Sequence, residues 1–138
     1  MIFIKKLNNY DGEILLDGVL DFFEKNKHKQ IAIVTSCNKS SAEFILKKKK
    51  LDKYIKILIA SEDCLKHKPD SEPYLNAIKK LNIEKNKCII FEDSYSGYCS
   101  AKNTDVYKIC LIINDDSCYD IKCANEFKIR DYNNLNIN

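Results

Sequence analysis

The amino-acid sequence predicts an α/β domain built around a parallel β-sheet. Short continuous apolar runs recur along the chain, and a helical pattern follows each of them. This alternation is typical of an open parallel sheet, because each parallel connection has to cross over the sheet and usually does so as a helix. The chain length of 138 residues fits one such domain.

Each predicted element follows from its local pattern. The strands are continuous apolar runs of the kind that is buried on both faces of a sheet, and Ser94 is placed to cap the helix that follows it. In chain order the predicted elements are helix 19–26, strand 30–34, helix from Ser41, strand 55–60, helix 71–81, strand 88–91, helix from Ser94, strand 107–113, a short strand 127–129 and a frayed tail over 133–138.

Polar groups follow three of these strands. Thr35 and Ser36 come directly after the strand 30–34, and Lys68 lies in the loop after the strand 55–60. Glu92 and Asp93 end the run that begins at Cys88. Because the carboxyl ends of parallel strands meet at one edge of a sheet, we expect these groups to converge there. A hydroxyl, an ammonium and paired acids suit a phosphoryl group and a divalent metal ion.

Each of these groups also fits a plain structural role. Two adjacent acids often open a surface helix, where they complement the helix dipole. A threonine at a strand end is commonly a turn residue, and a lysine in a loop is commonly solvated. Buried side by side, however, two like charges repel by roughly 4 kcal/mol at 4 Å, so a buried Glu92–Asp93 pair needs a cation.

The order and spacing of these groups resemble the haloacid dehalogenase-like (HAD) hydrolase superfamily, and within it the capped phosphatases and the beta-phosphoglucomutase-like branch. Residues 31–36 resemble the second motif of that superfamily and residues 66–70 the third. Residues 89–94, together with Gly97, resemble the fourth motif. The similarity runs from about Asp17 to the C-terminus.

The resemblance implies a Rossmann-like three-layer core, a Mg²⁺ ion and phosphoryl transfer through an aspartyl-phosphate. In that scheme Thr35 and Ser36 hold the phosphoryl oxygens, and Lys68 neutralises the phosphate and the nucleophile. Glu92 and Asp93 position the metal ion. The implied activity is a phosphatase acting on a small phosphorylated metabolite, with a phosphosugar mutase as the alternative.

The first motif of the superfamily, an Asp-x-Asp at the end of the first strand, has no match in this sequence. We therefore expect residues 1–16 to be a remnant of the cap domain or a linker, and 17–138 to be a core that lacks its first strand and most of the cap. Without its nucleophile the chain alone should be inactive. Two alternatives stay open: the first four residues fill the central place in the sheet, or the chain is a catalytically silent phosphate- or metal-binding module.

Composition narrows the choice of partner and compartment. A net charge of +3 predicts neither a nucleic-acid nor a membrane partner, and the run 47–50 of four lysines fits a solvated helix end. Seven cysteines show no zinc-binding spacing with the two histidines, which predicts reduced thiols in a cytoplasmic protein. A small-molecule phosphate ester is the expected ligand, and the oligomeric state stays open.

Overall fold

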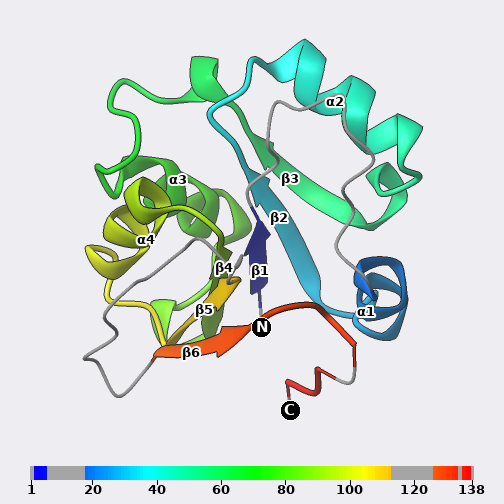
Figure 1. Cartoon of the computed structure of the whole chain (residues 1–138). Coiled ribbons are helices and arrows are strands. Elements are labelled where there is room, and N and C mark those ends of the chain that lie inside the picture. Colours follow the sequence, from blue (N-terminus) through cyan, green and yellow to red (C-terminus); the bar gives the residue numbers. More distant parts are fainter. Residues whose placement is uncertain (1, 6–17, 113–125, 134, 138) are drawn as a thin grey trace.

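The computed structural model of this chain describes residues 2–5, 18–112, 126–133 and 135–137. Six parallel strands form one sheet in the order β3-β2-β1-β4-β5-β6 (Figure 1). The strands are β1 (Ile2–Lys5), β2 (Gln30–Val34), β3 (Ile55–Ile59), β4 (Cys88–Glu92), β5 (Lys108–Ile112) and β6 (Glu126–Ile129). The α-helices are α1 (Val19–Lys25), α2 (Lys39–Lys48), α3 (Glu72–Leu81) and α4 (Tyr95–Lys102), and short 3-10 turns cover Asp52–Tyr54, Ser61–Asp63 and Lys85–Lys87.

Helices cover both faces of the sheet, as Figure 1 shows, with α1 and α2 on one side and α3 and α4 on the other. The side chains of β2 alternate between these two layers. Ile31 and Ile33 of β2 pack in the α1–α2 layer, whereas Ala32 and Val34 pack in the α3–α4 layer. This three-layer arrangement confirms the predicted Rossmann-like α/β class.

The centre of the sheet corrects the sequence prediction. We expected the first strand to be absent, yet β1 lies between β2 and β4, where Ile4 is in register with Ala32 on one side and with Ile90 on the other. The backbone explains why: without a strand there, β2 and β4 would have unpaired N–H and C=O groups in the interior of the sheet. Ile2–Lys5 thus belongs to the sheet. The rest of the predicted cap remnant or linker, residue 1 and residues 6–16, lies outside the described residues.

The other predicted elements agree with the structure within a few residues. Ser94 caps α4, with its hydroxyl accepting a hydrogen bond from the Gly97 amide at 3.2 Å, and Asn38 caps α2 in the same way through the Ser41 amide. The expected frayed tail is wrong in part, because Ile137 is only 8% exposed and packs in the α1–α2 layer. Within the described ranges no helix has the length and apolar character that crossing a bilayer requires.

Candidate active site

The predicted site residues come from segments that meet at the carboxyl edge of the sheet. β2 ends at Val34, directly before Thr35, and β4 ends at Glu92. Lys68 lies in the loop between β3 and α3, and its side chain extends between these two strand ends. Its Nζ donates hydrogen bonds to the Val34 carbonyl oxygen at 3.4 Å and to Oε1 of Glu92. The structure therefore brings together the three segments that resemble the second, third and fourth motifs of the superfamily.

Lys68 and Glu92 form a buried ion pair. Their side chains are 3% and 0% exposed. The second carboxylate oxygen of Glu92 accepts hydrogen bonds from the Ser94 hydroxyl at 3.1 Å and from the backbone amides of Asp93 and Ser94 at 3.2 and 3.3 Å. Removing two charges from water is costly, and the cost is offset only where attraction and hydrogen bonds engage both groups, as they do here.

Tyr74, in the first turn of α3, completes this cluster. Its side chain is fully buried, its hydroxyl accepts a hydrogen bond from Lys68 Nζ at 2.9 Å, and it donates to Oε1 of Glu92. The Lys68 ammonium also lies 4.6 Å from the centre of the Tyr74 ring. Burial, and then the charge of Glu92, raises the pKa of the Tyr74 hydroxyl well above its ordinary value, so this group stays a neutral donor.

The loop that carries Lys68 is tied to the helices on that face. The carboxylate of Glu72 accepts hydrogen bonds from the amides of Leu65 at 2.7 Å and Lys66 at 3.0 Å. The buried hydroxyl of Ser100, on α4, donates to the carbonyl oxygen of Asp70 at 2.5 Å. Lys68 thus extends from a loop that is held on both sides of it, which limits the positions its ammonium can take.

Hydrogen bonds also hold the turn that follows β2. Thr35 is 4% exposed, and its backbone amide donates to the carbonyl oxygen of Ile59 in β3 at 2.9 Å. Its hydroxyl accepts a hydrogen bond from the Cys37 amide at 3.1 Å, whereas Ser36 is exposed. The two residues therefore differ: Thr35 shapes the turn that leads into α2, and Ser36 faces solvent beside it.

The two predicted metal ligands have different surroundings. Both carboxylate oxygens of Glu92 already accept hydrogen bonds from protein donors, whereas Asp93 is half-buried. In the described part of the chain, no group of three or more histidine, cysteine, aspartate or glutamate side chains comes together as a metal site. These residues alone do not make up the oxygen shell that Mg²⁺ takes. The magnesium site therefore stays a prediction.

The Glu92 carboxylate explains why position 97 is a glycine. A Cβ atom at this position would lie 2.0 Å from Cδ of Glu92 and 2.1 Å from each of its carboxylate oxygens. The close neighbour of this helix position is therefore the Glu92 carboxylate at the end of β4. Only a residue without a side chain leaves room for the buried ion pair.

A separate cavity of about 510 Å³ lies between α1 and the C-terminal segment. None of the predicted site residues lines it. Asp21 shares its wall with Lys25 and Lys29, so the lining has no single sign of charge and indicates no one class of ligand.

Comparison with known proteins decides the family. The model of the family described as haloacid dehalogenase-like hydrolase matches residues 3–111. The chain belongs to this family. A phosphorylated carbohydrates phosphatase of Thermotoga maritima is 32% identical over 92 residues, which cover 67% of this chain and 43% of that protein. A validoxylamine A 7'-phosphate phosphatase of Streptomyces hygroscopicus is 27% identical over 113 residues, which cover 80% of this chain and 53% of that protein.

Solved structures agree with this assignment. A HAD hydrolase of Entamoeba histolytica superposes with a TM-score of 0.77 at 29% identity, covering 89% of this chain and 57% of that one. The chain thus spans about half the length of the curated relatives described above. The HAD-like core and membership of the haloacid dehalogenase-like hydrolase family, both expected from the sequence, are confirmed.

We predict that Gly97→Ala destabilises the protein by about 1–3 kcal/mol, because the new methyl group has to displace the Glu92 carboxylate. Alanine is intrinsically favoured over glycine in a helix by about 1 kcal/mol, so a net loss would report the steric conflict. Urea denaturation measures it. Ser96→Ala, at the exposed neighbouring position of α4, is the control and should leave stability within about 0.5 kcal/mol. A Gly97→Ala variant as stable as the parent chain would contradict the placement of Glu92.

Proposed function

We propose that this chain binds the phosphoryl group of a small phosphate ester at the carboxyl edge of β2 and β4, as part of a phosphomonoester hydrolase site. The convergence of Lys68, Glu92 and the turn at Thr35 supports this proposal. A cation held beside a strand end, next to a turn with hydroxyl and amide groups, is a suitable receptor for phosphate oxygens.

Each residue has a distinct part in the proposed site. Lys68 contributes the positive charge that offsets the negative charge of the phosphate, and Glu92 holds the Lys68 ammonium in place through the buried ion pair. Ser36 and the amides of the turn donate hydrogen bonds to the phosphoryl oxygens, with Thr35 shaping the turn. Asp93 is the residue that would hold a Mg²⁺ ion, whose role would be to neutralise charge that develops on the phosphate.

The nucleophile is the part that the chain does not supply at the expected place. The superfamily resemblance puts an aspartate at the end of the first strand, and in this sequence β1 is followed by Lys6. Hydrolysis through an aspartyl-phosphate therefore needs a carboxylate from elsewhere. Lys6 in this position favours a second candidate function, in which the chain binds phosphate compounds without hydrolysing them.

The relatives suggest the kind of substrate. Both the Thermotoga and the Streptomyces phosphatase are named for phosphorylated compounds, the first for phosphorylated carbohydrates. We accordingly propose a small phosphorylated metabolite of this type for the site at Lys68. Whether the whole enzyme is a phosphatase or a mutase depends on where the phosphoryl group goes after the first transfer.

Phosphate binding tests the proposal. We expect isothermal titration calorimetry to show that the chain binds inorganic phosphate, and that the Lys68→Met/Glu92→Gln double variant binds it at least roughly tenfold more weakly, since charged hydrogen bonds are worth about 1.5–3 kcal/mol. Changing both residues avoids leaving an isolated buried charge. The matched control is Lys87→Met/Glu84→Gln, which removes an exposed ion pair of 2.9 Å. Equal phosphate affinity in the two double variants would overturn the proposed site.

Turnover tests the role of the missing nucleophile. We predict that the chain does not hydrolyse p-nitrophenyl phosphate, and that Lys6→Asp/Asn8→Asp, which places Asp-x-Asp directly after β1, gives measurable Mg²⁺-dependent hydrolysis. The same double change combined with Lys68→Met/Glu92→Gln should stay inactive. Hydrolysis by the unaltered chain would show that it already has a nucleophile. No hydrolysis by a folded, phosphate-binding Lys6→Asp/Asn8→Asp variant would favour the silent binding module.

A further inference from the structure

The ammonium group of Lys68 donates hydrogen bonds to several protein acceptors. A lysine ammonium has three N–H donors, and among the described residues three acceptors lie within reach: the Val34 carbonyl oxygen, the Tyr74 hydroxyl and Oε1 of Glu92. The contact with Val34 is the longest, at 3.4 Å, against 2.9 Å for Tyr74. It is the contact that an incoming acceptor replaces at the lowest cost.

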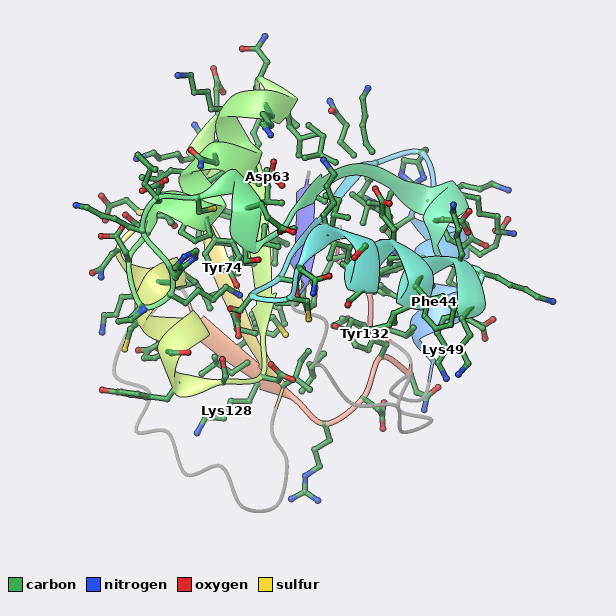
Figure 2. All side chains as sticks on the ribbon, turned by 90° about the horizontal axis from the view of Figure 1, so that it is seen from above. Phe44, Lys49, Asp63, Tyr74, Lys128 and Tyr132 are labelled. Atoms are coloured by element: carbon green, nitrogen blue, oxygen red, sulfur yellow. The ribbon has the colours of Figure 1, made fainter. Side chains whose placement is uncertain are left out.

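The position of the Val34 contact indicates where an incoming phosphate oxygen would replace it. Val34 directly precedes Thr35, so the acceptor of this longest contact lies at the start of the turn where the phosphoryl group would sit. The other two acceptors come from α3 and from the end of β4, and Tyr74 packs in the α3–α4 layer, as the side chain of Val34 also does. Figure 2 labels Tyr74 on this side, with Tyr132 on the opposite side.

We propose that Tyr74 is a positioning residue for Lys68: its hydroxyl, together with Glu92, fixes two of the three ammonium donors so that the third faces the phosphate. This inference rests on the proposed function. Tyr74 does not touch the phosphate and acts through Lys68.

Packing does not explain the hydroxyl group of Tyr74. The ring of Tyr74 fills a buried place in the apolar layer of α3 and α4, which a phenylalanine ring would fill equally well. Its oxygen, however, lies between an ammonium and a carboxylate, accepting from the first and donating to the second. A buried hydroxyl in an apolar layer is costly unless it makes such contacts. Tyr74→Phe therefore removes the positioning contact and keeps the ring.

The test compares Tyr74→Phe with Tyr107→Phe, which removes a hydroxyl from a tyrosine that is 48% exposed. Calorimetry with inorganic phosphate should show roughly two- to tenfold weaker binding for Tyr74→Phe, because the Lys68 ammonium is then ordered only when phosphate binds, and unchanged binding for Tyr107→Phe. Circular dichroism should show the same helix and strand content for both variants.

A spectroscopic signal separates positioning from packing. The ¹H–¹⁵N signal of the Lys68 ammonium, assigned by its absence from the Lys68→Met/Glu92→Gln variant, should be visible in the parent chain, because buried hydrogen-bonded protons exchange slowly. We expect it to shift and broaden in Tyr74→Phe and to stay unchanged in Tyr107→Phe. A loss of packing alone would leave this signal in place.

The outcomes distinguish the two proposals. If the parent chain binds no phosphate, the proposed function is overturned, whatever the variants do. If the parent chain binds phosphate and Tyr74→Phe binds it equally well with an unchanged Lys68 signal, the proposed function stands and the role of Tyr74 is overturned. A parent chain that shows no slowly exchanging Lys68 ammonium would overturn the role of Tyr74 as well.

Discussion

The carboxyl edge of the sheet is organised around one interaction, the buried ion pair of Lys68 and Glu92. It connects the end of β4 with the loop between β3 and α3, and through the Val34 carbonyl it extends to the end of β2. Because neither side chain is exposed by more than 3%, each charge depends on the other and on the hydrogen bonds around it. The glycine at position 97 and the hydroxyls of Tyr74 and Ser94 are requirements of this pair.

The geometry of the sheet explains why the pair forms where it does. Cys88 and Ile90 of β4 face the α3–α4 layer, and Glu92 continues this alternation by two residues. Its carboxylate therefore enters the space between α3 and α4, where Tyr74 lies. Asp93 comes after the end of the strand and is half-buried. Two adjacent acids thus have different surroundings, which is why we assign one to holding Lys68 and propose the other for the metal ion.

Much of this arrangement could be predicted from the sequence. The apolar runs identified β2 to β6, and their order along the chain indicated which polar groups would meet. β1 was more difficult, since four residues followed by lysines resemble a terminus more than a central strand, and only the pairing needs of β2 and β4 indicate its place. The burial of Ile137 was missed because the C-terminal segment has no periodic pattern.

The contacts that hold Lys68 were beyond the reach of sequence patterns. Tyr74 and Ser100 occupy ordinary buried positions of amphipathic helices, and nothing in the periodicity of α3 or α4 distinguishes a hydroxyl that packs from one that bonds. Their roles depend on which loop atoms lie opposite them, the Lys68 ammonium in one case and the Asp70 carbonyl in the other. The tight fit of Gly97 against Glu92 is likewise a fact of three-dimensional packing.

The most direct test of this account is a double-mutant cycle on stability, with Lys68→Met, Glu92→Gln and both changes together, measured by urea denaturation. Each single change should lower the free energy of unfolding by about 3–5 kcal/mol, because it leaves the other charge buried without its partner, and the double variant should lose clearly less than the sum. The same cycle on the exposed pair Lys87 and Glu84 should give a coupling of at most about 1 kcal/mol. Additive losses at Lys68 and Glu92 would contradict the account, because they would mean that the two charges do not depend on each other.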